Sequence, residues 1–300
     1  MKFRSFVRLA AALVPIALGS VAAHAYDKII VFGDSYNDVG NIYTAAAAFH
    51  IVYPPPPYYH GQFSNGPIWV EHIASDLGLP LQPSLLGGTD YATGGAELLK
   101  TVSIAGLPIL SIEDQVAAYL LSTGGKADPN ALYVIEGGGN DILNATEFDP
   151  GKLGCEIATG LYGMEKTLRK AGAKHFLVPD LLDIGQLPAA AAGGEAFIEF
   201  ASATTIAANR ELLRDLEVEA HRPGIQIVTV PVFRTFLAVA NASTHFGFTD
   251  VTTPCLVTSG LTVISECADP DHTLWWDAEH PSEFGHAFFA VLVEGALNRH

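Results

Sequence analysis

The sequence contains few basic residues. Of its 300 residues, 16 are lysine or arginine and 32 are aspartate or glutamate, which gives a formal net charge of −16. A surface this acidic repels the phosphates of nucleic acids and of anionic lipid headgroups. The composition therefore argues against a nucleic-acid-binding protein, and we expect no nucleic acid among its partners.

The motifs that commonly hold metals and nucleotides are also missing. The sequence has no H-E-x-x-H, no paired C-x-x-C, no G-x-x-x-x-G-K and no dinucleotide fingerprint. Asp250, Asp269 and Asp271 could suggest calcium, but they do not have the spacing of an EF-hand loop. We therefore expect that the protein uses no cofactor and no metal.

The first 25 residues have the pattern of a secretory signal peptide. Lys2, Arg4 and Arg8 make a basic start, residues 9–21 are apolar, and Ala23-His24-Ala25 is a small-x-small cleavage sequence. The apolar stretch is shorter than the about 20 residues that span a bilayer. We expect cleavage near Ala25, secretion to the periplasm or the medium, and no stable membrane insertion. A retained N-terminal anchor is the alternative.

Cysteine is scarce, with three residues in the chain. Cys255 and Cys267 flank a stretch that contains Gly260 and is compatible with a small closed loop, and secretion permits disulfides. We predict that these two cysteines pair, and that Cys155 stays unpaired and buried on a helix. The alternative is that all three are reduced and buried.

Residues 26–300 suit a single α/β domain, because apolar β-rich runs alternate with helical patterns. We expect strands at 28–32, 89–92, 132–135, 175–178 and 225–230, and helices at 67–77, 111–121, 153–171, 195–220 and 281–297. Crossovers between parallel strands are nearly always right-handed, so the expected product is a three-layer α/β/α sandwich. Residues 53–59, four prolines with tyrosines, either line an acyl or aryl pocket or form a rigid surface loop.

Ser35 is the predicted nucleophile. It follows the first expected strand in Gly33-Asp34-Ser35, where glycine allows a tight turn. A serine hydroxyl becomes a good nucleophile only when a base takes its proton. The alternative is that Asp34 or Ser35 merely caps the next helix.

His280 is the predicted base, and Asp277 lies three residues before it. A histidine accepts protons near neutral pH, and an aspartate can fix its tautomer and stabilise the imidazolium. Pro281 favours a helix start directly after these residues. The alternative is a structural role for the whole segment.

Asn140 and Gly95 are the predicted partners of the developing oxyanion. Both follow expected strand ends, as Ser35 does, and ligands of open α/β sheets bind at that edge. The Asn140 amide and the N–H groups of Ser35 and Gly95 would provide three donors. The alternatives are an Asx-turn closed by Asn140 and Asp141, and a simple turn at Gly94-Gly95.

Together these segments resemble the sequence blocks of the SGNH/GDSL hydrolase superfamily, in particular its secreted bacterial lipase/esterase branch. The similar stretches are 32–41, 91–96, 138–141 and 277–281, with 61–67 and 179–181 in addition. The resemblance implies a five-stranded parallel sheet in the flavodoxin-like order 2-1-3-4-5. It also implies the roles given above for Ser35, Asp277, His280, Gly95 and Asn140. Tyr36 stands where the name-giving motif has leucine, and we expect it to affect only local packing or the pocket mouth.

The sequence therefore predicts a secreted serine esterase or lipase that acts on a small-molecule or lipid ester. An acyltransferase or a phospholipase that uses the same site is the first alternative. A non-catalytic binding protein on the same fold is the second, although a binding module does not need this combination of side chains.

Overall fold

The fold is built around a parallel sheet in the order β1-β4-β5-β6. A computed structural model describes residues 26–104 and 106–299, and the predicted signal peptide lies outside these residues. The strands are β1 (Lys28–Phe32), β4 (Ala131–Ile135), β5 (His175–Pro179) and β6 (Gln226–Val230). All five residues of β4 are buried. Such continuous burial is typical of a parallel sheet that is covered on both faces.

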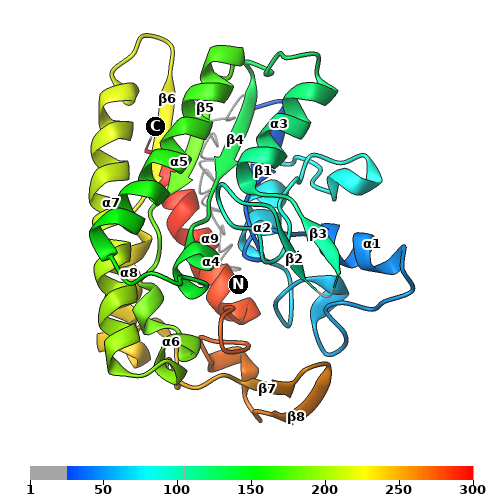
Figure 1. The fold of residues 1–300 in the computed structure, drawn as a ribbon, viewed down its shortest axis with the longest axis vertical. Coiled ribbons are helices and arrows are strands. Elements are labelled where there is room, and N and C mark those ends of the chain that lie inside the picture. The colour runs from blue at the N-terminus through cyan, green and yellow to red at the C-terminus, as the bar shows by residue number, and fades with distance from the viewer. Residues whose placement is uncertain (1–25, 105, 300) are drawn as a thin grey trace, which may run out of the picture.

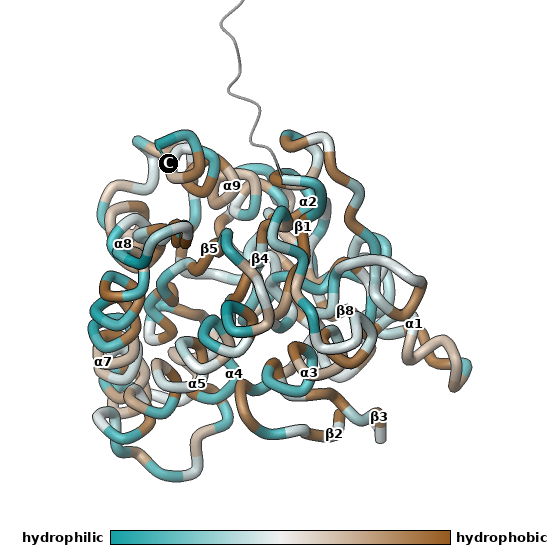
Figure 2. The backbone as a smooth tube through the Cα atoms, turned by 90° about the horizontal axis from the view of Figure 1, so that it is seen from above, coloured by the Kyte–Doolittle hydropathy of each residue, from teal (hydrophilic) through white to brown (hydrophobic). Residues whose placement is uncertain are grey.

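Helices cover both faces of this sheet (Figures 1 and 2), which confirms the predicted α/β class. One face carries α3 (Ile112–Ser122) and α5 (Pro150–Ala171), and the other carries α2 (Trp69–Asp76) and α9 (Glu283–Leu297). The remaining helices are α1 (Asn41–Ala47), α4 (Gly139–Leu143), α6 (Pro188–Ala192), α7 (Glu195–Ala220) and α8 (Val232–Asn241). Within the described ranges, no helix has both the length and the apolarity to cross a membrane.

Serine side chains cap the N-termini of α3 and α9. Ser111 caps α3, and its side chain accepts the Asp114 N–H at 3.0 Å. Ser282 caps α9 and accepts the Gly285 N–H at 3.2 Å. Because a serine cap satisfies an N–H that lacks an intrahelical partner, α9 begins two residues after the predicted start at 281.

The predicted strand at 89–92 is wrong, and the described sheet has four strands rather than five. The segment does lie beside β1, but only Asp90 bridges to it, through Val31. The Asp90 carboxylate accepts the N–H of Ala92 at 2.9 Å and that of Val39 at 2.8 Å. An aspartate that bonds the backbone two residues ahead turns the chain, so the strand does not continue.

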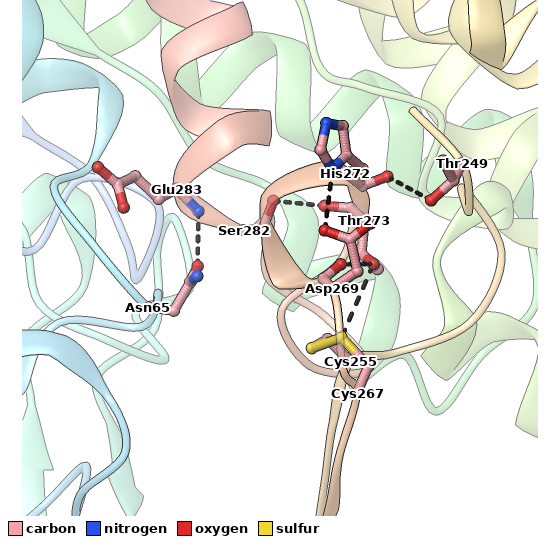
Figure 3. The surroundings of a disulfide bond; sticks show 9 residues. All are labelled: Asn65, Thr249, Cys255, Cys267, Asp269, His272, Thr273, Ser282 and Glu283. Carbon is pink, nitrogen blue, oxygen red and sulfur yellow. Dashed lines mark hydrogen bonds and ion pairs between the residues drawn. A yellow bond between two sulfur atoms is a disulfide. The ribbon is translucent and has the colours of Figure 1, made fainter. Parts of the chain in front are cut away.

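Two hairpins outside the central sheet were not predicted. They are formed by β2 (Val102–Ile104) with β3 (Leu107–Ile109), and by β7 (Leu256–Ser259) with β8 (Thr262–Glu266). The second hairpin projects from the body of the molecule (Figure 1). The predicted disulfide between Cys255 and Cys267 is confirmed, and it closes the base of this hairpin (Figure 3).

The prediction that Cys155 is buried is wrong. Cys155 lies on a helix, α5, but it is exposed. The buried face of α5 includes Gly154, Ile157 and Ala158, and residue 155 falls outside this stripe. The helical period of 3.6 residues therefore places the thiol in solvent.

Candidate active site

Ser35 lies just beyond the carboxyl end of β1. The preceding Gly33 is held by Gln115, which accepts the Gly33 N–H at 3.0 Å and donates to the Gly33 carbonyl at 2.9 Å. A Cβ at residue 33 would lie 2.2 Å from Asn37 Nδ2, so the turn requires glycine. The Ser35 residue is only 7% exposed. Its hydroxyl is therefore held in one place at the end of a buried strand.

Ser35, His280 and Asp277 form a continuous chain of hydrogen bonds. Ser35 Oγ lies 2.8 Å from His280 Nε2, although the two residues are 245 positions apart. His280 Nδ1 lies 2.8 Å from each carboxylate oxygen of Asp277. A hydroxyl, an imidazole and a carboxylate in this order have the geometry of an activated nucleophile.

The loop that carries His280 is closed by Asp277. Asp277 Oδ1 accepts the N–H groups of Glu279 and His280, both at 2.8 Å. The helix that follows is tied to the same region by Ser282, whose hydroxyl donates to the Thr273 carbonyl (Figure 3). These bonds fix the imidazole ring relative to Ser35 before any substrate arrives.

Asp277 has one more donor, which the sequence analysis missed. The Tyr58 hydroxyl donates to Asp277 Oδ2 at 2.6 Å. Phe63 stacks on the His280 ring, with centroids 4.8 Å apart and planes at 27°. Tyr58 belongs to the 53–59 segment, and it lines a pocket together with Tyr53. No sequence signal links Tyr58 to Asp277, because the two are 219 residues apart.

Burial and charge act in opposite directions on the buried pair. Burial disfavours the protonated ring of His280, but the Asp277 charge and its hydrogen bond outweigh burial and raise the pKa of His280 above 6.5. Burial also disfavours the Asp277 carboxylate, but the His280 charge and the surrounding donors lower the pKa of Asp277 below 3.8. The site therefore stabilises an imidazolium beside a carboxylate.

Gly95 shares a pocket with Ser35 and His280. It has φ = +80°, and a Cβ there would lie 2.2 Å from Ile104 Cδ1, so the position requires glycine. The neighbouring Gly94 N–H donates to a carboxylate oxygen of Asp38 at 2.8 Å. Among the described residues, neither the Ser35 N–H nor the Gly95 N–H has a hydrogen-bond partner.

Asn140 lies in α4 and lines two of the pockets that reach Ser35. Its Nδ2 donates to the Ala96 carbonyl at 3.1 Å, and its side chain also hydrogen-bonds the Asp34 carboxylate. The neighbouring Asp141 accepts the Leu98 N–H at 3.1 Å. Both side chains thus bind the segment that carries Gly95, and do not close an Asx-turn on their own loop.

Tyr36 connects the two halves of the site. Its hydroxyl donates to the Glu279 carbonyl at 2.6 Å, and its ring centroid lies 5.9 Å from that of His280. It also lines a pocket beside Ser35, as expected for the pocket mouth. The tyrosine therefore does more than local packing, because it links the turn at residue 35 to the loop at residue 280.

Three pockets meet at His280. The first reaches Ser35 and encloses about 400 Å³ of space, part of which is open to solvent. The second contains Gly95, and the third lies between the 53–63 segment and β7. The apolar wall of the first is formed by Leu143, Leu181, Leu182, Ile184 and Leu187. Such a wall suits a hydrocarbon chain.

No metal site accompanies these pockets. In residues 26–104 and 106–299, no group of three or more His, Cys, Asp or Glu side chains is arranged to hold a metal ion.

Residues 29–293 match the family model described as GDSL-like Lipase/Acylhydrolase. The chain is 27% identical over 289 residues to thermolabile hemolysin of Vibrio parahaemolyticus and 33% identical over 190 residues to lipase 1 of Photorhabdus luminescens. It is 28% identical over 238 residues to phosphatidylcholine-sterol acyltransferase of Aeromonas hydrophila. These matches cover 91%, 62% and 77% of this chain, but only 64%, 27% and 66% of the relatives' lengths.

Among solved structures, the chain resembles a member of the lipolytic protein G-D-S-L family from Veillonella parvula. The similarity covers 91% of this chain and 99% of that chain, with a TM-score of 0.47 and 14% sequence identity.

Proposed function

The chain belongs to the GDSL-like lipase/acylhydrolase family, and from this premise we propose that it is a secreted serine esterase or lipase. The observation that carries the proposal is the unbroken hydrogen-bonded chain from Ser35 through His280 to Asp277, with contacts of 2.8 Å. In this proposal Ser35 is the nucleophile, His280 the general base and Asp277 the residue that orients His280.

The reaction would begin when Ser35 Oγ attacks the ester carbonyl carbon while His280 Nε2 takes the hydroxyl proton. The oxyanion would accept hydrogen bonds from the Ser35 N–H, the Gly95 N–H and the Asn140 amide. The unpaired N–H groups of Ser35 and Gly95 support this assignment, because a preorganised donor is most effective when it has no other partner. His280 then protonates the leaving alcohol, and water hydrolyses the acyl-enzyme by the same steps.

Secretion and a single catalytic domain over residues 26–300 are part of the proposal. The disulfide between Cys255 and Cys267 fits an oxidising compartment outside the cytosol. The match to the family model extends from 29 to 293 and so supports one continuous hydrolase domain. Cleavage near Ala25 is testable by N-terminal sequencing of the exported protein.

Acyl transfer to an alcohol other than water is the second candidate. It uses the same acyl-enzyme. The similarity to a protein named phosphatidylcholine-sterol acyltransferase favours it over other alternative reactions at this site. Product analysis with an added sterol or alcohol separates transfer from hydrolysis, because only transfer forms a new ester.

The proposal is tested with purified mature protein and a series of p-nitrophenyl esters from acetate to palmitate. We expect turnover of at least part of the series, and labelling of Ser35 by a serine-reactive phosphonate with loss of activity. The preferred chain length then distinguishes an esterase from a lipase. A folded protein that neither turns over any ester nor takes up the phosphonate would contradict the proposal and support a binding protein.

The rate of ester hydrolysis is expected to rise with pH as His280 loses its proton. Only neutral His280 can accept the Ser35 proton, and Asp277 raises the pKa of His280 above 6.5 despite burial. The acidic limb of the kcat/KM profile should therefore have its midpoint above pH 6.5. The full rate is expected at pH values above this midpoint, and activity is lost at pH values below it. A rate that is flat from pH 5 to 8 would count against His280 as the base.

Replacement of Tyr58 by phenylalanine is expected to lower kcat about 10-fold and to move the acidic limb to higher pH. The variant loses one hydrogen bond to a buried carboxylate. Without this donor, more of the Asp277 charge acts on the imidazolium, so the pKa of His280 rises further. The measurement is the pH profile of kcat/KM for one p-nitrophenyl ester.

The matched control for this variant is Tyr59→Phe. Tyr59 lies in the same segment, and its hydroxyl has no hydrogen-bond partner in the described part of the chain. If Tyr58 only packed the loop, Tyr58→Phe would lower the rate equally at every pH. An unshifted limb would therefore exclude a positioning role for the Tyr58 hydroxyl.

A further inference from the structure

The three pockets at His280 are lined by carboxylates and by no lysine or arginine. Glu279 lines all three pockets, and it is exposed. The other acidic residues are Asp34 and Glu136 in the first pocket, Glu97 in the second and Asp277 in the third. Burial raises the pKa of Asp34 to about 6 and that of Glu136 well above its usual range, so these two contribute less charge than Glu279. A substrate that reaches Ser35 therefore meets the exposed Glu279 carboxylate and no lysine or arginine.

The third pocket adds aromatic rings to this charge. Tyr53, Tyr58 and Phe63 line it together with Glu279. Both tyrosine rings meet Phe63 edge to face, with centroids 5.9 Å and 6.1 Å from it. The Tyr58 hydroxyl is already donated to Asp277, so its ring is the part that can contact a ligand.

The charge of Glu279 reaches these rings. Burial raises the pKa of Tyr53, and the negative charges of Glu279 and Asp277 raise it further. Aromatic rings and an exposed carboxylate line the same pocket, and both attract a cation. A ring can also attract a cation that carries no N–H donor. Asp277 is less available for this purpose, because it is bound by His280 and by Tyr58.

We propose that the third pocket binds the alcohol part of the ester, and that it favours alcohols that carry a quaternary ammonium group. The inference rests on the proposed function, since this alcohol must be esterified to the acyl group that Ser35 attacks. The apolar first pocket, which is lined by Ser35 and His280, then holds the acyl chain. Glu279 is the residue that sets the charge preference, and an ester with an anionic alcohol is disfavoured.

The test compares two butyrate esters that differ only in charge, choline butyrate and 3,3-dimethylbutyl butyrate. In the second ester a carbon replaces the quaternary nitrogen, so shape and size are kept. We expect kcat/KM to be about 5- to 30-fold higher for the choline ester. One exposed charge and one cation–π contact together stabilise the bound cation by an amount that corresponds to this ratio. Glu279→Gln should reduce this ratio to about 1 to 3.

The ratio is the measured quantity, because Glu279 also raises the pKa of His280 and its loss changes both rates together. The control is Glu217→Gln, which removes an exposed carboxylate from the far end of α7 and should keep the wild-type ratio. A second measurement compares how strongly choline and 3,3-dimethylbutanol inhibit the hydrolysis of p-nitrophenyl butyrate. Choline should be the stronger inhibitor of the wild-type protein, and Glu279→Gln should abolish this difference.

A wild-type ratio near 1, with equal inhibition by the two alcohols, would overturn the cation preference and leave the esterase intact. A preference for choline that persists in Glu279→Gln would overturn the role of Glu279. Absence of turnover of both butyrates and of the whole p-nitrophenyl series would overturn the proposed function, and this inference with it.

Discussion

Ser35→Ala is expected to lower kcat for ester hydrolysis by about 10⁴- to 10⁶-fold. The Ser35 hydroxyl lies at hydrogen-bond distance, 2.8 Å, from His280 Nε2. Without it no acyl-enzyme forms, and only the oxyanion donors and substrate binding remain. The rate should be measured on a p-nitrophenyl ester with protein free of host esterases.

The loss should leave the fold intact. Ser35 contributes one side-chain hydrogen bond, so the free energy of unfolding in urea should change by no more than about 1.5 kcal/mol. Ser259→Ala, at an exposed serine of β7, serves as the control and should keep full activity. Retention of more than a tenth of the wild-type kcat by Ser35→Ala would contradict the assignment of Ser35 as the nucleophile.

Asp277→Asn should have the second largest effect, a fall in kcat of about 10³- to 10⁴-fold. Asp277 accepts bonds from the His280 ring, from two backbone N–H groups and from Tyr58. An amide presents an N–H group to one of these donors and carries no charge. The imidazole then loses its tautomer and orientation, and the imidazolium loses its stabilisation.

Asp269→Asn is a matched control for this variant. Asp269 also precedes a histidine by three residues, and its Oδ1 lies 2.8 Å from His272 Nδ1. Both partners of that pair are more than half exposed, and neither lines the pockets at Ser35. An equal loss of kcat in both variants would mean that the Asp277 effect is structural damage to this part of the chain.

The two Asp-x-x-His segments show which contacts of the site can be predicted from the sequence. Both Asp269 and Asp277 bond a histidine three residues ahead, because the contact is made within one turn of chain. Only the segment at 277–280 precedes a proline. The burial of His280 against Ser35, in contrast, depends on packing between the two ends of the chain.

The fold also has parts that the sequence predicts and parts that depend on tertiary contacts. Strands β1, β4, β5 and β6 were predictable because each is a continuous apolar run, which only a sheet covered on both faces can bury. The segment at 89–92, Thr-Asp-Tyr-Ala, has no such apolar run, and whether it joined the sheet depended on the backbone N–H groups that the Asp90 carboxylate reaches after folding.

The sequence by itself determined the α/β class, the disulfide between Cys255 and Cys267, and the turns that place Ser35 and His280. These features follow from interactions between residues that are close along the chain, and such interactions leave a pattern of spacing and residue type. Only the tertiary structure decided that Tyr58 bonds Asp277, that Tyr36 bonds the loop of His280, and that Glu279 borders three pockets. The two hydrogen bonds join residues more than 200 positions apart, where spacing carries no information because packing alone sets the distance.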